Sequence, residues 1–253
     1  MQKALNRSFS RLPNSMRPIS LEPNYYDYAE GSCLIAYGNT QVLCVATVED
    51  SPPPHLRGKG LGWVTGEYNM LPRSSPDRIR RERDRIGGRT HEIQRLIGRA
   101  LRSVVNMQGW GERSIILDCD VLRADGGTRT ASITGAFVAL VLAFRKMRAV
   151  GKVSQSLKFP VSDFMSAVSV GLVGGVPVLD LDYVEDSSAD TDMNLIMTSI
   201  GHIVEIQGTA EKTPFSPEEF SQMLELGKQG CQSLCAIQRE ILGPLDWAGG
   251  RPV

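Results

Sequence analysis

The chain has 253 residues, of which 42% are hydrophobic, and its basic and acidic residues balance to a formal net charge of zero. This length and composition are typical of a soluble globular protein with a sizeable core, built as one large domain or two closely packed ones. They disfavour a generally basic nucleic-acid-binding protein, and the longest apolar run, residues 136–144, is far shorter than the ~20 residues that a membrane span needs.

Residues 1–16 are polar and contain no continuous apolar stretch, which argues against a secretory signal. We expect a flexible extension over 1–16, a main domain over 17–242 and a flexible tail over 243–253. The five cysteines are scattered and odd in number, which favours reduced thiols, and the three histidines lie too far apart in the sequence to predict a zinc site. The expected compartment is the cytoplasm.

The first predicted element is a β-hairpin within residues 32–50, where two β-rich runs flank the turn residues Gly38-Asn39. After it, residues 73–102 contain ten arginines and no lysine against four acids, a local excess of six positive charges. Arginine forks favour geometrically specific recognition of phosphate or carboxylate groups. The alternative is a solvated charged loop.

Two helices are predicted to begin at clusters of glycine, arginine and threonine. The first cluster, residues 87–90, precedes a helical stripe of apolar residues that extends to Val105, and the second, residues 126–130, precedes an apolar helix from about Thr130 to Met147. A helix N-terminus favours an anion, glycines let the anion approach the backbone, and an arginine fork binds two oxygens. Both clusters therefore indicate phosphate ligands, unless the glycines serve only turns and the threonines only caps. The chain contains no Walker sequence, which counts against an ordinary nucleotide triphosphatase.

Further β structure is predicted on both sides of the second of these helices. A strand is expected over 113–123, since apolar residues at 115, 117, 119 and 121 alternate with polar ones. A second hairpin is expected within 165–186, around Gly174-Gly175. Both hairpin segments end in Val-Glu-Asp, at 48–50 and 184–186, which indicates two related halves.

Six acidic residues crowd the segment 179–194. Carboxylates this dense repel one another unless a cation or a substrate group binds them. Mg²⁺ is the natural candidate because one or two carboxylates hold it together with water and substrate phosphate, and the spacing is not that of an EF-hand. A solvated acidic turn is the alternative. The six residues are Asp180, Asp182, Glu185, Asp186, Asp190 and Asp192.

The last predicted helix begins at Ser216, where a capping box is followed by Pro217 at the first helical position. Pairs of strands followed by helices, with no long linker, predict an α/β protein whose halves pack together.

Five long motifs stand out along the chain: "GWVTGEYNMLPRS", "GGRTHEIQRLIGRALRSVV", "LDCDVLRADGGTRTASITGAFVAL", "LDLDYVEDSSADTDMN" and "VEIQGTAEKTPFS". In their order and spacing they resemble the ribonuclease PH family. The resemblance covers about residues 17–241. It implies mixed β-sheets with packed helices, an α/β (α+β) fold in two pseudo-repeated halves, within one compact catalytic domain over 17–242.

The resemblance also implies a phosphorolytic 3′→5′ exoribonuclease. In that family inorganic phosphate attacks the 3′-terminal phosphodiester of RNA and releases a nucleoside 5′-diphosphate, and the reverse reaction adds nucleotides to RNA 3′ ends. The implied substrates are tRNA precursors and some other RNAs, such as rRNA, and the implied assembly is a homohexamer, a trimer of dimers. No membrane or DNA partner is expected.

By the same resemblance, the attacking phosphate is held by Arg89 of the first cluster and by Gly127, Thr128 and Arg129 of the second. Arg89 and Arg129 are thereby also expected to be catalytic, since positioning and electrostatic stabilisation dominate phosphoryl transfer.

Asp186 and Asp192 match the paired catalytic carboxylates of the family, which are expected to bind Mg²⁺ beside the scissile phosphate. Proton transfer is an alternative role for Asp186. Arg73, Arg78 and Arg81 match the arginines of a tRNA-binding loop.

The sequence departs from the family pattern at three places. The stretch "RRERDRI", residues 80–86, is richer in alternating charge than expected, Arg123 stands where glutamine is usual, and Gly66 stands where alanine is usual. These departures affect the expected RNA contacts rather than the reaction.

Two other functions remain as alternatives. A non-catalytic ring subunit of the same fold would have lost the phosphate arginines or the aspartate pair, and neither is lost. A small-molecule kinase or phosphatase would not explain the arginine-rich stretch or the extent of the resemblance.

Overall fold

The computed structural model describes residues 7–82 and 85–248. Its elements in chain order are the 3-10 helix η1 (Ser8–Ser10), β1 (Ile19–Pro23), β2 (Gly31–Tyr37), β3 (Thr40–Glu49), the 3-10 helix η2 (Pro54–Leu56), β4 (Trp63–Met70), α1 (Gly88–Ser103), β5 (Ser114–Arg123), α2 (Thr128–Ala149), β6 (Met165–Val173), β7 (Val176–Leu179), α3 (Tyr183–Ser188), β8 (Thr191–Thr198), β9 (Ile203–Ala210) and α4 (Pro217–Leu242).

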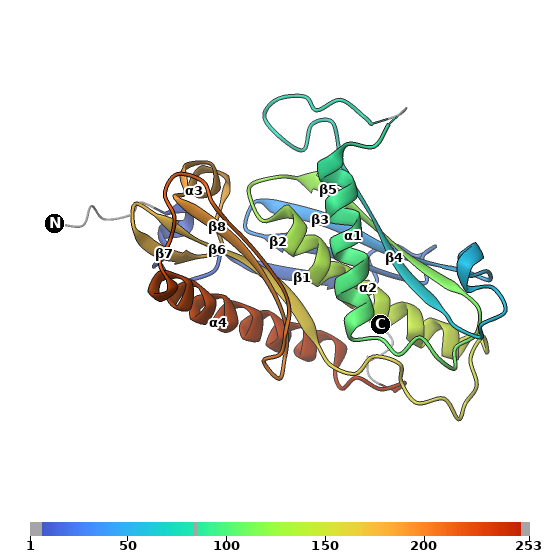
Figure 1. The fold of residues 1–253 in the computed structure, drawn as a ribbon. Coiled ribbons are helices and arrows are strands. Elements are labelled where there is room, and N and C mark those ends of the chain that lie inside the picture. The colour runs from blue at the N-terminus through green and yellow to red at the C-terminus, as the bar shows by residue number, and fades with distance from the viewer. Residues whose placement is uncertain (1–6, 83–84, 249–253) are drawn as a thin grey trace.

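The first sheet has the strand order β1-β2-β3-β5-β4, and its pairs are antiparallel except for the parallel pair β4–β5. The hairpin predicted around Gly38-Asn39 is formed by β2 and β3, and the predicted strand at 113–123 is β5. The alternation along β5 buries Ile115, Leu117 and Cys119 beneath α2. Helix α1 packs on β4 beside it (Figure 1).

The second sheet has the order β7-β6-β8-β9 and is antiparallel throughout. The second predicted hairpin, around Gly174-Gly175, joins β6 to β7. Helix α4 packs on β6, β7 and β8, while α2 of the first half contacts β6 as well. Strand β6 is therefore buried along nearly its whole length, and the two halves share one core.

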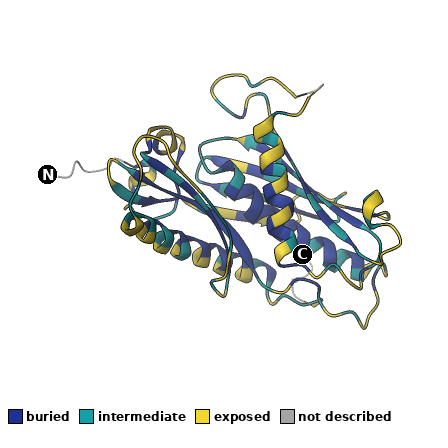
Figure 2. Ribbon diagram, in the orientation of Figure 1, coloured by how far each residue is buried: buried dark blue, intermediate teal, exposed yellow. Residues whose placement is uncertain are grey.

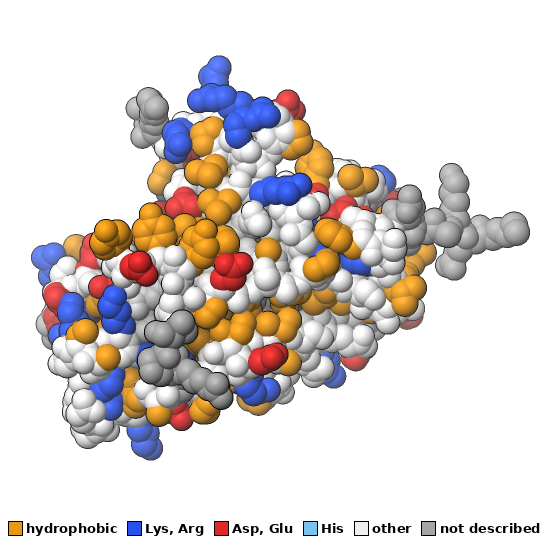
Figure 3. Space-filling model, turned by 180° about the vertical axis from the view of Figure 1, so that it is seen from behind, with side chains coloured by type: hydrophobic (Ala, Val, Ile, Leu, Met, Phe, Trp, Pro, Cys, Tyr) orange, Lys and Arg blue, Asp and Glu red, His pale blue; other side chains and the backbone are white. Residues whose placement is uncertain are grey.

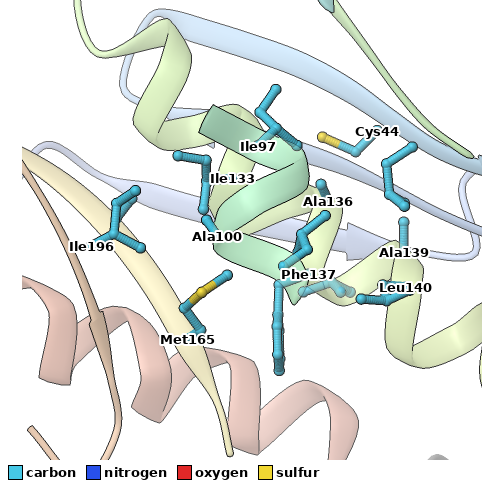
Figure 4. Packing of buried hydrophobic residues seen from close by; sticks show 14 of the residues in the cluster. Cys44, Ile97, Ala100, Ile133, Ala136, Phe137, Ala139, Leu140, Met165 and Ile196 are labelled. Carbon is cyan, nitrogen blue, oxygen red and sulfur yellow. The ribbon is translucent and has the colours of Figure 1, made fainter. Parts of the chain in front are cut away.

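Helix α2 lies at the centre of this core. It is long and apolar enough to cross a membrane by length and composition, but most of it is buried inside the protein, as in the core helix of a globular fold (Figure 2). Figure 4 shows Ile133 and Phe137 of α2 among residues of α1 and of the second sheet, such as Ile97 and Met165. These contacts fix α2, and hence its N-terminus, relative to both sheets.

Close packing of α1 explains the glycine at position 66, where the family usually has alanine. A Cβ at this position of β4 would lie 2.6 Å from a methyl carbon of Ile97, so the missing side chain lets α1 approach the strand closely. The five cysteines are free and buried, as predicted.

Parts of the expected N-terminal extension and C-terminal tail make defined contacts with the rest of the protein. Of the extension expected to be flexible, residues 7–16 pack against the second sheet, where the guanidinium groups of Arg7 and Arg11 are buried. Of the expected tail, Trp247 donates a hydrogen bond to the Leu157 carbonyl and stacks with Arg148. Residues 1–6 and 249–253 lie outside the described part of the chain.

The repeated tripeptide also has a different structure in each half. Val48 and Glu49 end strand β3, whereas residues 184–186 lie in helix α3, which the sequence analysis did not predict. The cause is local, because Asp182 and Glu185 form a capping box that starts a helix directly after β7. Each half contains one sheet with packed helices, but the tripeptide is not evidence that the halves are related.

Candidate active site

A cleft of about 1750 Å³ opens where the two sheets meet. It is lined by residues from the N-terminal ends of α1 and α2, by α3, and by β8 and β9. Figure 1 shows α3 and the N-terminal end of α1 at the same upper side of the molecule. Every residue of the expected phosphate and metal sites lines this cleft: Arg89, Gly127, Thr128, Arg129, Asp186 and Asp192.

The chain enters α2 through a turn whose backbone an anion can approach closely. We call residues 125–128 the glycine turn. Gly126 and Gly127 have φ values of +75° and +66°, a left-handed conformation that strains other residues. The cap residue Gly127 has no side chain to satisfy the first N–H groups of α2, and the helix dipole adds positive potential there. An anion in the cleft would be favoured at this end of α2.

Thr128, at the end of this turn, and Arg129, directly after it, are held by different elements. The buried Thr128 hydroxyl lies 2.9 Å from the Tyr68 hydroxyl of β4. The Arg129 guanidinium lies 3.2 Å from both the Glu92 carboxylate of α1 and the Gln207 amide oxygen of β9. Tyr68, Glu92 and Gln207 were not predicted by the sequence analysis. Glu92 and Gln207 hold Arg129 at the cleft between the two sheets, and Tyr68 holds Thr128.

The N-terminus of α1 already binds an anionic group. The Glu82 carboxylate accepts hydrogen bonds from the Gly87 amide at 3.0 Å and from the Thr90 hydroxyl at 3.2 Å. Two members of the first predicted cluster are therefore used within the loop, and Arg89 is the member that lines the cleft. The glycine turn of α2 is thus the better candidate for an external anion.

The arginine-rich loop, described over residues 71–82 and 85–87, projects from the rim of the cleft (Figure 1). Arg73 lines the cleft, whereas Arg78 and Arg81 are exposed farther along the loop. Figure 3 shows basic side chains gathered on this projection. Arg123, the residue found where the family has glutamine, is exposed and lines the cleft at the end of β5. The loop is therefore a basic surface next to the site.

The acidic segment does not act as one cluster. Asp180, Asp182 and Glu185 are buried and form ion pairs with arginines of the N-terminal segment, and Asp190 pairs with Lys212. Of the six acids, Asp186 and Asp192 are the ones that line the cleft. The negative charges of the other four acids are neutralised by arginine and lysine side chains of the protein itself.

The cleft raises the pKa of both Asp186 and Asp192. For Asp186 the cause is reduced hydration, which the charges of Arg129 and Arg89 partly offset. For Asp192 the causes are reduced hydration and then the negative charges of Asp186 and Glu211. Glu211, which lines the cleft but was not predicted, is thus a third carboxylate near the pair. A positive ion placed between these carboxylates would be stabilised.

The donor set fits a divalent cation that is completed by its substrate. Within residues 7–82 and 85–248, no group of three or more histidine, cysteine or acidic side chains is arranged to hold a metal on its own. Mg²⁺ is commonly held by one or two carboxylates together with substrate phosphates and water. Asp186 and Asp192 are suitable as those two carboxylates, opposite the glycine turn.

Comparison with known proteins identifies the family. The models of the 3′ exoribonuclease family match residues 15–146 as domain 1 and residues 163–230 as domain 2. Curated relatives named ribonuclease PH from Syntrophomonas wolfei and Moorella thermoacetica are 53% and 54% identical over 241 residues, which cover 94% of this chain and 100% and 95% of theirs.

Solved structures share the fold at lower identity. The Archaeoglobus fulgidus exosome with RNA bound to the active site gives a TM-score of 0.77 at 21% identity, covering 91% of this chain and 92% of that one. An archaeal exosome core gives 0.71 at 21% identity, with 90% and 89% covered. Together, the matched family models and the full-length relatives show that the chain belongs to the ribonuclease PH family of phosphorolytic 3′→5′ exoribonucleases.

Proposed function

We propose that the cleft binds inorganic phosphate at the glycine turn and uses it to shorten RNA from the 3′ end. One phosphate oxygen attacks the 5′ phosphorus of the terminal nucleotide, the bond from that phosphorus to the preceding 3′ oxygen breaks, and the 3′ oxygen takes up a proton. The products are a nucleoside 5′-diphosphate and an RNA shorter by one nucleotide. The observation that carries the proposal is one cleft that contains a helix N-terminus without a side-chain cap, Arg129 and two carboxylates of raised pKa.

Each group has a defined task in this proposal. The N–H groups at the start of α2, with Arg129 and Arg89, would hold the attacking phosphate and reduce its repulsion from the RNA phosphate. Asp186 and Asp192 would hold Mg²⁺, which supplies positive charge to the phosphoryl group in the transition state. A raised pKa also makes Asp186 suited to proton transfer, which is the alternative role.

The substrate and assembly belong to the same proposal. The exposed arginines of the loop beside the cleft would bind phosphates of the RNA body, and tRNA precursors are the expected substrates. A homohexamer, a trimer of dimers, is the expected assembly. The RNA-bound exosome that shares this fold supports an RNA partner.

RNA shortening should require both inorganic phosphate and Mg²⁺, because the anion site and the carboxylate pair serve one reaction. The experiment incubates purified protein with a 3′-extended tRNA, with each component present or omitted, and identifies the nucleotide products by chromatography. Nucleoside diphosphates are expected only when both are present. Adding excess nucleoside diphosphate should lengthen the RNA.

Nucleoside monophosphates in phosphate-free buffer would show hydrolysis and contradict the proposal. Binding of the RNA without any shortening would favour the non-catalytic ring subunit. As a control, EDTA is added and then excess Mg²⁺. Recovery of activity shows that EDTA removed the ion and did not inactivate the protein.

Replacing Arg73, Arg78 and Arg81 together by alanine should weaken tRNA binding and flatten its salt dependence. Each arginine that neutralises an RNA phosphate displaces counterions, so each lost contact should reduce the slope of log K against log salt by about 0.7 to 1. Phosphorolysis of a short single-stranded oligonucleotide should fall much less, because the glycine turn and the carboxylates are intact. Activity on both substrates at two salt concentrations measures the difference.

Equal losses on tRNA and oligonucleotide, with an unchanged salt slope, would place these arginines in the active site or in a subunit interface. Arg57→Ala, a change of another arginine outside the cleft, is the matched control.

A further inference from the structure

Three arginines near the N-terminus are almost completely buried. Arg7, Arg11 and Arg17 are only 4%, 8% and 1% exposed, and we call them the arginine cluster. Burying a guanidinium group is costly unless every side of it is paired. Each of the three is paired with the same short segment, residues 179–185, which connects β7 to α3. The cluster therefore holds the segment that leads directly to Asp186.

Arg7 and Arg11 fix this segment through its backbone and one carboxylate. Arg7 donates to the Leu179 carbonyl at 2.6 Å, and Arg11 donates to the Asp180 carbonyl at 2.7 Å. Both also donate to Glu185, at 3.1 Å each. Glu185 belongs to the capping box that starts α3, and Asp186 follows it in the same helical turn. The position of the Asp186 backbone thus depends on the arginine cluster.

Arg17 makes a further connection, to the glycine turn. Its guanidinium donates to both carboxylate oxygens of Asp180, at 2.7 and 3.0 Å, and its amide donates to the same carboxylate at 2.8 Å. The other side of the guanidinium donates to the Asp125 carbonyl and, at 3.5 Å, to the Gly126 carbonyl. One buried side chain therefore touches both halves of the proposed active site.

The two segments that Arg17 joins are in direct contact. A Cβ on Gly126 would lie 2.6 Å from the Leu181 carbonyl oxygen, so the glycine turn packs against the backbone just before α3. Thr40 supports the turn from β3, because its hydroxyl donates to the Gly126 carbonyl at 2.6 Å. Asp180 adopts a φ of +58°, an uncommon conformation that its pairing with Arg17 helps to maintain. This arrangement leaves little freedom between the turn and α3.

We propose that Arg17, acting through Asp180, is a positioning residue that sets the separation between the glycine turn, which holds the phosphate, and Asp186. The inference rests on the proposed function. A buried ion pair often adds little net stability over uncharged groups of similar shape, so we assign Arg17 a geometric role rather than a stabilising one. A misplacement of about 1 Å between reacting groups can cost on the order of 100-fold in rate. Arg17 is not among the residues that line the cleft, and its guanidinium binds Asp180 and the backbone of the glycine turn, so we class it as a positioning residue.

The first test is Arg17→Lys. A lysine keeps the charge, but its single ammonium group cannot replace a fork that binds Asp180 on one side and Asp125 on the other. We expect kcat to fall about 10-fold and the Mg²⁺ concentration for half-maximal rate to rise. The KM for phosphate should stay within about 3-fold, because the phosphate ligands on α2 move together. The rate is expressed per phosphate-binding site counted by calorimetry, so that unfolded protein does not contribute.

A double variant tests the same point without an unpaired buried charge. Arg17→Met/Asp180→Asn removes both charges, and asparagine tolerates the positive φ at this position. It should fold, bind phosphate and lose about 100-fold in kcat, more than Arg17→Lys, which keeps part of the contact.

The matched control is Arg148→Met, at the other end of α2. Arg148 donates to the Leu157 carbonyl at 2.8 Å and stacks on Trp247, far from the glycine turn. It should lower the unfolding temperature without lowering kcat per site.

Folded Arg17 variants with the wild-type kcat and Mg²⁺ dependence would overturn the inference, as would an equal loss of kcat in Arg148→Met. Failure of both Arg17 variants to fold would show a purely structural cluster and overturn it as well. A wild-type protein without phosphorolytic activity would instead contradict the proposed function, and the inference that rests on it.

Discussion

Arg129→Ala should raise the KM for inorganic phosphate and lower kcat/KM by on the order of 100-fold or more, without unfolding the protein. The guanidinium lies at the start of α2, 3.2 Å from both Glu92 and Gln207, and lines the cleft beside the glycine turn. Removing one preorganised group that stabilises developing negative charge typically costs 100- to 1000-fold. Initial rates over a range of phosphate concentrations separate KM from kcat.

The stability of this variant should change little, because its ion pair with Glu92 is partly exposed and such pairs contribute about 0 to 1 kcal/mol. Arg113→Ala is the matched control, since Arg113 forms a similar pair with Asp50 at the opposite end of β5 from the cleft. Wild-type turnover with an unchanged KM in folded Arg129→Ala would remove Arg129 from the phosphate site.

The parts of the site that the sequence predicts are those encoded by neighbouring residues. Two glycines followed by Thr128 and Arg129 indicate a helix that starts with an open N-terminus, and α2 begins at Thr128. The alternation along β5 and the capping box at Ser216 are equally local, and both are confirmed. Local patterns depend on geometry within one or two turns of chain, so a single sequence reveals them.

The contacts that the sequence does not predict join distant segments. Arg17 and Asp180 are 163 residues apart, and Arg129 lies 78 residues from Gln207. The acidic segment looked like one cation-binding cluster because nothing near it in the sequence shows that arginines of the N-terminus neutralise it. The burial of Arg7 and Arg11 is not visible in the sequence for the same reason, since residues 7–16 have the polar composition of a solvated extension and the partners of these arginines lie far along the chain.

Asp186→Asn should abolish most phosphorolysis, by on the order of 100-fold or more in kcat, while leaving the KM for phosphate nearly unchanged. The side chain lines the cleft on α3, and its carboxylate is one of the two that would hold Mg²⁺. Asparagine keeps the shape but loses the charge, so the variant should also need more Mg²⁺ for its residual activity. Rates measured across a Mg²⁺ titration check both effects, with Asp190→Asn as the control outside the proposed metal site.

The same variant makes a prediction about stability that distinguishes an active-site carboxylate from a structural one. The pKa of Asp186 is raised in the folded protein, because reduced hydration favours the neutral acid. Its favourable contribution to folding is therefore present at a pH below the unfolded value and is lost as the pH rises through the folded value. Above the folded value the ionised group opposes folding, and the exposure of Asp186 in the open cleft limits this effect. Asp186→Asn should thus unfold at the same or a slightly higher temperature than wild type at pH 7, and the difference should vanish near pH 3. A marked loss of thermal stability at pH 7 would show that Asp186 stabilises the fold. The lost activity could then not be assigned to a role of Asp186 in the reaction.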